Sequence, residues 1–119
     1  MANKIKTFRE LNIWNAGIEI VKAIYQLTEI FPKQETYDLI SQMRRSAVSI
    51  PSNVAEGFRR FHNKEYRQFL YTSLGSCAEL ETQLTIAMEL NYIQKDTENK
   101  LLEKLDHICR MVSNLIKKL

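Results

Sequence analysis

The sequence predicts an all-α protein with a single domain over residues 1–119, folded as an up-down-up-down four-helix bundle. Apolar residues recur at alternating spacings of three and four positions in four successive stretches, the period of helices that bury one face. Short segments separate these stretches, and short links make consecutive helices antiparallel neighbours. With only 3 Gly and 2 Pro in 119 residues, the chain has few positions for long loops.

The first helix is predicted near the amino terminus. Thr7 and Glu10 match a capping box, with Thr7 as the N-cap and Glu10 reaching back from the first turn. A bundle-type seam follows at Leu11, Trp14, Ile18, Val21, Tyr25 and Thr28, widened by Ile24 and Leu27. Gly17 lies inside this helix, where glycine costs about 1 kcal/mol relative to alanine, so we expect a neighbouring helix to approach closely there. Phe31 and Pro32 end the helix because the residue before a proline avoids helical angles.

The second helix contains a proline near its middle. Its apolar face is formed by Leu39, Met43, Ala47, Ile50, Val54 and Phe58. Pro51 has no N–H to donate to the carbonyl of Ala47. Short polar side chains that can bond nearby backbone groups surround this proline: Ser49, Ser52 and Asn53. We therefore expect one helix, kinked at Pro51 and reaching residue 56 or beyond, rather than two helices. Gly57 suits a left-handed C-terminal cap.

The third and fourth helices follow the link of residues 58–63. Asn63 is the predicted N-cap of the third helix, whose seam is Leu70, Ser73, Cys77, Leu80, Leu84 and Ala87. Gly75 and Ser76 are small residues among apolar neighbours, which predicts a helix crossing. Asp96 or Thr97 is expected to cap the fourth helix. Its heptads are the most regular of the chain: Leu101, Leu105, Ile108, Val112, Leu115 and Leu119.

The run SIPSNVAEG at residues 49–57, within the stretch 43–57, is a specific sequence motif. Other positions that accompany it are Leu11, Trp14, Ala16, Phe31, Pro32, Tyr37, Arg60, Gly75, Ser76, Glu79, Leu80, Glu81, Gln83 and Leu84. With these residues the chain resembles the four helix bundle protein family, also called 23S rRNA intervening-sequence proteins or S23 ribosomal proteins. The resemblance implies a polar network of Arg44, Glu56, Arg60, Glu79 and Gln83, which we interpret as an internal ion cluster that fixes helix register.

Positive charge is concentrated around the junction of the second and third helices. The chain has 17 Lys and Arg and 14 Asp and Glu, a net charge of +3. Between residues 44 and 67 there are six Lys and Arg but only two Asp and Glu. Aromatic side chains interleave with these cations at Phe58, Phe61, His62 and Tyr66, as on nucleic-acid-binding surfaces. We expect four cations to face solvent and contact phosphates: Arg45, Arg59, Lys64 and Arg67. A merely solvated basic patch is the alternative.

The sequence indicates no catalytic residues, no metal site and no cofactor. His62 and His107 lack partners at metal-binding spacings, and no Gly-rich loop follows a strand, so we expect a protein that is not an enzyme. Cys77 and Cys109 lack metal-ligand spacing and are expected to be reduced thiols. No apolar run approaches the length of a membrane span and no secretory signal is visible, which predicts a cytoplasmic protein.

Two classes of function fit these observations. The resemblance implies a bacterial homo-oligomer, a ring of five copies by similarity to the accessory variability protein of diversity-generating retroelements, which is thought to contact nucleic acid and a reverse transcriptase. Such a ring would pool basic patches and bind RNA or DNA. Apolar residues outside the narrow seams are expected to form contact surfaces: Ile13, Ile20, Ile40, Val48, Leu102 and Ile116. The alternative is a protein-interaction scaffold whose arginines are structural.

Overall fold

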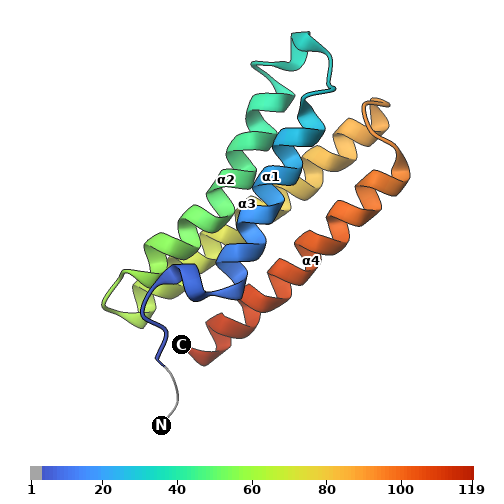
Figure 1. The fold of residues 1–119 in the computed structure, drawn as a ribbon. Helices are drawn as coiled ribbons and strands as arrows, with labels where there is room; N and C mark the ends of the chain where they lie inside the picture. The colour runs from blue at the N-terminus through green and yellow to red at the C-terminus, as the bar shows by residue number, and fades with distance from the viewer. Residues whose placement is uncertain (1–3) are drawn as a thin grey trace.

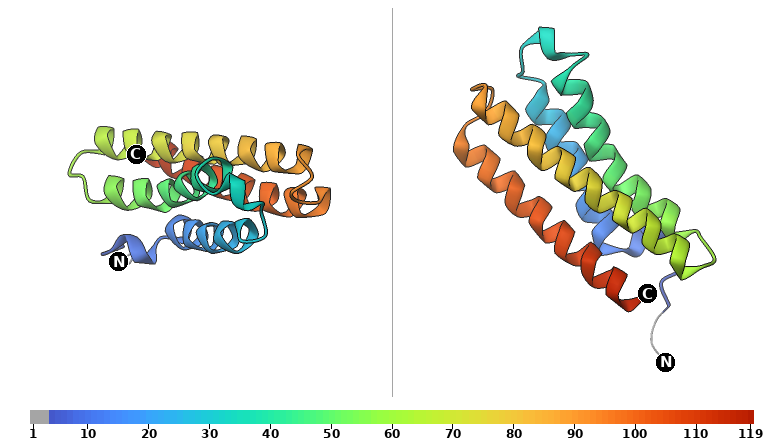
Figure 2. Two further views of the ribbon diagram at one scale, coloured as in Figure 1. Left: turned by 90° about the horizontal axis from the view of Figure 1, so that it is seen from above. Right: turned by 180° about the vertical axis from the view of Figure 1, so that it is seen from behind.

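The computed structural model describes residues 4–119 and confirms the predicted four-helix bundle. Its elements are η1 (Phe8–Glu10), α1 (Asn12–Thr28), η2 (Lys33–Glu35), α2 (Leu39–Phe58), α3 (Asn63–Glu89) and α4 (Lys95–Lys118). The α1–α2 and α3–α4 links lie at one end of the bundle. The α2–α3 link lies at the other end with the described start of the chain and the C-terminus (Figure 1, Figure 2). The first three residues of the predicted domain lie outside the described part.

The four helices share one core, and α2 is the central element of the packing. It contacts both α1 and α3, whereas α4 packs chiefly against α3. The view from above in Figure 2 shows α1 and α3 as outer layers with α2 between them. The largest fully buried apolar side chains come from all four helices: Ile20, Ile24, Met43, Ile50, Val54, Leu70, Leu80, Leu84, Leu105, Ile108 and Val112. The bundle measures 51 × 25 × 19 Å, and along the described chain no helix is both long and apolar enough to cross a membrane.

The predicted buried faces are confirmed for α3 and, apart from the partly buried Phe58, for α2. The predicted seam of α1 is right only in part: Leu11, Ile24 and Thr28 are buried, but the rest of the buried face of this helix differs. Its buried residues are Ile13, Gly17, Ile20, Ile24 and Thr28, so the helix is rotated relative to the predicted seam. Trp14, Ile18 and Val21 are only partly buried, and Tyr25 is exposed. Both sets of residues are apolar and both recur every three or four positions, so periodicity alone does not distinguish them.

The capping box at the start of the chain is present, but it caps η1 rather than α1. The Thr7 hydroxyl accepts a hydrogen bond from the backbone N–H of Arg9 at 3.4 Å, and the Glu10 carboxylate accepts one from the N–H of Thr7 at 3.1 Å. The helix α1 begins only after Leu11. Asn15 joins the two elements, because its side-chain amide donates to the carbonyl oxygens of Arg9 and Leu11 at 2.9 and 3.0 Å.

The helix α2 continues through Pro51, as predicted, while the angle of the expected kink stays a prediction. Gly17 of α1 makes room for the proline ring. A Cβ atom on Gly17 would lie 3.0 Å from Cβ and 3.2 Å from Cδ of Pro51. The expectation that a neighbouring helix approaches Gly17 closely is therefore confirmed, and the neighbour is the proline turn of α2.

Polar side chains bond the backbone around the proline turn and tie it to α3. The Asn53 amide donates to the carbonyl oxygen and the hydroxyl of Ser49 at 2.8 and 2.9 Å. The Ser49 hydroxyl is 2.7 Å from that of Ser76 on α3, and the Ser73 hydroxyl donates to the carbonyl of Ile50 at 3.0 Å. The remaining predicted kink residue, Ser52, is exposed. Ser76 thus lies at the predicted crossing of α2 and α3, whereas Gly75 is exposed with nothing near its missing side chain.

The helix ends differ from the predicted caps. Gly57 has no left-handed backbone and lies inside α2, which ends one residue later at Phe58. Asn63 begins α3 and His62 occupies its N-cap position. The helix α4 begins at Lys95, before both predicted cap residues, so its N-cap position is Gln94.

Asn91 ends α3 with the left-handed conformation that the sequence assigned to Gly57. Its φ is 65°, and among the described residues no other non-glycine φ is positive. The N–H of Tyr92 donates to the carbonyl of Ala87, and the N–H of Asn91 donates to that of Met88, both at 2.9 Å. These two bonds form a Schellman motif, in which asparagine replaces the usual glycine.

Two side-chain contacts hold the links at the end opposite the α2–α3 link. The Tyr92 hydroxyl donates to the Glu35 carboxylate at 2.7 Å, which joins the α3–α4 link to η2. Glu98 in the first turn of α4 is 2% exposed and accepts hydrogen bonds from Lys95 at 2.9 Å and from Thr85 of α3 at 2.7 Å. These bonds, first that from Lys95, lower the pKa of Glu98.

Candidate functional site

Cationic residues from three separate parts of the chain lie at the end of the bundle that contains the α2–α3 link. Figure 1 shows the backbone of this end, where the α2–α3 link, the described start of the chain and the C-terminus lie together. We call this end, with its links and the adjoining five residues of each helix, the basic end. Its cations are Lys4, Lys6, Arg9, Arg59, Arg60, Lys64, Arg67, Lys117 and Lys118, and its acidic residues are Glu10, Glu56 and Glu65. The amide of Asn63 donates to the Leu119 carbonyl at 3.4 Å, which brings the end of α4 to the start of α3.

The opposite end has the reverse charge, and we call it the acidic end. By the same definition its acidic residues are Glu29, Glu35, Asp38, Glu89, Asp96 and Glu98, and its cations are Lys33 and Lys95. The net charge of the chain is small, but positive and negative charges are separated along the long axis of the bundle. Such a separation focuses the positive field on one end.

Aromatic rings position two arginines of the basic end. The guanidinium of Arg59 lies 5.4 Å from the centroid of the Phe8 ring, and that of Arg9 lies 5.4 Å from the same ring and 5.3 Å from Trp14. Phe8 and Trp14 pack against each other with their centroids 5.4 Å apart. The start of the chain is thereby held against the end of α2 by cation–π contacts.

A close approach of α2 and α3 determines the position of Arg60 at the basic end. A Cβ atom on Gly57 would lie 2.9 Å from Tyr66 Cδ1 and from Phe69 Cβ, so only glycine allows this separation. The guanidinium of Arg60 lies over the Phe69 ring at 4.7 Å. Tight packing below the link thus holds Arg60 at the surface beside Phe61, whose side chain is 99% exposed.

The structure brings together three of the four predicted phosphate-contacting residues. Arg59 and Lys64 are exposed, Arg67 is partly buried, and in the described chain none of the three forms an ion pair. Arg45 is also exposed, but it lies about 21 Å from Arg59 along α2, since each helical residue rises about 1.5 Å. The predicted set is therefore divided between the basic end and the middle of the bundle.

Arg45 instead lines a groove of about 340 Å³ between α2 and α3. The other lining residues are Gln42, Ser46, Ser49, Glu79 and Gln83. Gln83 is 8% exposed, and its Oε1 atom has no hydrogen-bond partner in the structure. This groove contains two of the residues assigned to the polar network, Glu79 and Gln83.

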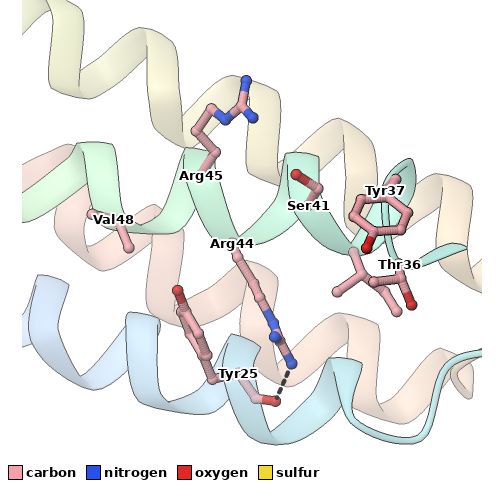
Figure 3. A pocket seen from close by; sticks show the side chains of 8 residues that line it. Tyr25, Thr36, Tyr37, Ser41, Arg44, Arg45 and Val48 are labelled. Carbon is pink, nitrogen blue, oxygen red and sulfur yellow. Dashed lines mark hydrogen bonds between the residues drawn. The ribbon is translucent and has the colours of Figure 1, made fainter. Parts of the chain in front are cut away.

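The predicted polar network does not form within the described chain. Arg44 reaches away from α3 and toward α1, where its Nε donates to the Thr28 hydroxyl at 2.9 Å. Figure 3 shows its guanidinium beside Tyr25, 4.5 Å from the ring and donating to the Tyr25 carbonyl at 3.4 Å. Glu56, Arg60 and Glu79 are exposed. The interpretation as an internal ion cluster therefore needs correction, because α2 places Arg44 on its α1 side and Arg60 beyond its C-terminal end.

The described residues contain no cluster of three or more His, Cys, Asp or Glu side chains placed to hold a metal ion. Both cysteines are free thiols and come together between α3 and α4. The thiol of Cys77 donates a hydrogen bond to Cys109, which lowers the pKa of Cys109 and, with burial, raises that of Cys77.

Residues 9–114 match the protein family described as 23S rRNA-intervening sequence protein. The chain belongs to this family. A crystal structure of a protein with unknown function from the S23 ribosomal protein family, from Bacteroides thetaiotaomicron, is similar with a TM-score of 0.81. The similarity covers 88% of this chain and 98% of that chain at 20% sequence identity, which supports the bundle fold. No protein with a curated description matches the chain.

Sequence reasoning missed the cations at the two ends of the chain. Lys4, Lys6, Arg9, Lys117 and Lys118 were outside the predicted basic cluster. The predicted topology contained the necessary information, because in an up-down-up-down bundle both chain ends lie beside the α2–α3 link. Counting charges by bundle end rather than by sequence window would have found them.

Proposed function

We propose that this family member is not an enzyme but a homo-oligomer that binds nucleic acid through phosphate contacts at its basic end. The observation that carries the proposal is the gathering of cations from three chain segments at one end, with an acidic end opposite. Arg59 and Lys64 are exposed without ion-pair partners in the described chain, so their charge is available to phosphates. The family description names 23S rRNA, which favours RNA as the first polyanion to test.

Assembly strengthens such a site. Several modest basic ends in one particle produce a stronger field and allow several contacts with one strand. A ring of five copies is the arrangement that the family resemblance implies. DNA and a reverse transcriptase or another protein remain further candidate partners in this proposal.

The test is a fluorescence anisotropy titration of the protein with structured RNA and with duplex DNA, at low and at moderate salt. Phosphate contacts release counterions, so affinity should fall steeply as salt rises, with little dependence on sequence. The double variant Arg59→Ala/Lys64→Ala should bind more weakly and should flatten the logarithmic salt slope by about one unit per lost contact.

The matched control is Lys33→Ala/Lys104→Ala, which removes the same charge from exposed positions outside the basic end. It should bind as the wild type does. Arg45→Ala measures separately whether the groove between α2 and α3 contributes. Absence of binding at low salt by a folded, assembled protein would contradict the proposal.

An interaction scaffold is the second candidate, and a groove between α1 and α4 favours it. The groove has a volume of about 920 Å³ and an apolar floor that includes Ile20, Leu27 and Ile108. Charged residues at its rim include Glu19, Lys100 and Lys104. If the protein is a scaffold, its association with a partner protein should not depend on salt. The double variant Arg59→Ala/Lys64→Ala should bind that partner as the wild type does.

A further inference from the structure

The α2–α3 link carries an apolar side chain that nothing in the fold explains. Phe61 is 99% exposed, whereas the other phenylalanine, tyrosine and tryptophan side chains of the basic end are partly buried. Phe58 and Tyr66 pack edge to face at 6.3 Å, and Phe8 and Phe69 support arginines. These rings are structural, so Phe61 is the apolar ring at this end that remains available to a partner, beside the exposed imidazole of His62.

Three cationic residues lie within three positions of Phe61 in the sequence, and aromatic rings position two of them. Arg59 and Arg60 are its near neighbours in the link, and each guanidinium is held over the ring of another residue, Phe8 or Phe69. Lys64 lies in the first turn of α3 and is exposed. An exposed ring among unpaired cations matches the chemistry of a nucleotide, which presents a flat base beside a charged phosphate.

A paired base does not offer this combination. In a duplex each base face is covered by its neighbours, and inserting a side chain between them costs a few kcal/mol of lost stacking. An unpaired base exposes its face at no such cost, and stacking on an aromatic side chain is then favourable for every base type.

We propose that Phe61 stacks on an unpaired base while Arg59, Arg60 and Lys64 contact the neighbouring phosphates. The basic end then prefers single-stranded nucleic acid, including the loops of a structured RNA, over a duplex. This inference rests on the proposed nucleic-acid function and adds its substrate class.

The test measures affinity at one fixed salt concentration for labelled strands of about 12 nucleotides, within the range covered by known single-strand-binding domains. The probes are oligo-U RNA, oligo-dT DNA and a blunt duplex of the same length. Phe61→Ala should weaken binding of the single strands about tenfold or more. It should leave duplex binding and the salt slope unchanged, because no charge is lost. Phe61→Trp keeps a stacking ring and should bind the single strands as the wild type does.

The matched control is Ile30→Ala. Ile30 is 75% exposed and lies in the α1–α2 link at the acidic end, so its truncation deletes an exposed apolar side chain away from the site. It should bind all three probes as the wild type does. Circular dichroism and thermal unfolding should show that Phe61→Ala is folded, since its side chain contributes no packing.

The outcomes separate this inference from the function on which it rests. If the wild type binds no probe, the proposed function fails. If it binds through Arg59 and Lys64 but Phe61→Ala binds the single strands unchanged, the stacking inference is overturned and the phosphate-binding function stands. Equal losses on single strands and duplex also overturn it. The stacking inference is also overturned if Phe61→Ala weakens binding to anionic lipid vesicles but does not weaken binding to the single strands.

Discussion

Gly17 of α1 lies against the ring of Pro51 of α2, with the position of a Cβ atom on Gly17 only 3.0 Å from Cβ of the proline. Each residue is unfavourable in the interior of a helix when considered alone. Together they bring two helices into close contact, because glycine leaves the space that the proline ring fills. The contact also selects the buried face of α1, since Gly17 shares that face with Ile13, Ile20 and Ile24.

Replacing Gly17 by alanine should therefore destabilise the protein, although alanine favours helices. Pro51 is buried and its ring is rigid, so we expect overpacking of about 1–3 kcal/mol to exceed the propensity gain of about 1 kcal/mol. Gly75→Ala is the matched control, because it adds a methyl group where no atom lies within 4 Å, and it should stabilise the protein by about 0.5–1 kcal/mol. Denaturant unfolding measures both changes. Equal stabilisation by the two substitutions would contradict this account of the contact.

Arg44 and Arg60 should differ in their effects on stability. Arg44→Ala removes the bond to Thr28 and the contact with the Tyr25 ring, which predicts a loss of about 1–2 kcal/mol. Arg60→Ala removes only an exposed stacking contact with Phe69, so we expect a loss within about 1 kcal/mol. A larger effect at Arg60 than at Arg44 in thermal unfolding would indicate a buried carboxylate partner for Arg60, as the sequence suggested.

Glu98 should make stability depend on pH in the acidic range. The pKa of Glu98 is lowered in the fold by its bonds from Lys95 and Thr85, so folding favours the charged form. This contribution is fully present above about pH 4.3, the usual glutamate pKa, and is lost as the pH falls through the lowered value. Glu98→Gln should be less stable than the wild type at pH 7, and the difference should shrink below pH 4.3. Glu103→Gln makes the same substitution at an exposed position of α4 and is the matched control for it.

The two cysteines should react with alkylating reagents at different rates. The hydrogen bond from Cys77 lowers the pKa of Cys109, so the Cys109 thiolate forms at a lower pH than that of an ordinary cysteine. Mass spectrometry after brief iodoacetamide treatment across a pH series should show Cys109 modified first, while buried Cys77 stays protected in the folded state. Cys77→Ala removes the donor and should shift the reaction of Cys109 to higher pH. Faster modification of Cys77 in the wild type would contradict the assigned donor.

Light scattering should give a particle mass near five times the 14.0 kDa of one chain. Exposed Tyr25, Tyr37 and Val48 line a hollow of about 450 Å³ on the α1–α2 side, together with Arg44 (Figure 3). A charge in this apolar patch, introduced by Val48→Glu, should reduce the mass toward that of one chain. A wild-type mass of 14.0 kDa at micromolar concentration would rule out the oligomer.

The number, order and direction of the helices could be predicted because heptad spacing and short links determine them directly. Of the apolar residues expected to form contact surfaces, however, Ile13, Ile20 and Ile40 are buried and only Val48 is exposed. Two apolar stripes on one helix satisfy the same period, and the choice between them depends on which partner helix allows closer approach. For α1 that choice follows from a contact between residues distant in sequence.

The caps and the polar network show the same limitation. Gly57 is required by the nearness of Tyr66 and Phe69 rather than by a left-handed turn, and this nearness exists only once α2 and α3 have packed. Likewise, sequence periodicity shows which face of its own helix Arg44 or Glu79 lies on. It does not show how α2 and α3 are rotated relative to each other, so it could not predict whether the two side chains meet. The basic end could have been predicted from the sequence, because the helix topology and the positions of the charged residues are enough to define it.

Charge separation along a bundle 51 Å long gives the molecule an electric dipole. As the bundle diffuses toward a polyanion, the field exerts a torque that turns the basic end forward before contact. Encounters are therefore oriented, and a larger share of collisions begins with the α2–α3 link nearest the strand. In the proposed complex the acidic end faces away from the bound strand and repels a second polyanion, so we expect that one bundle does not bridge two strands.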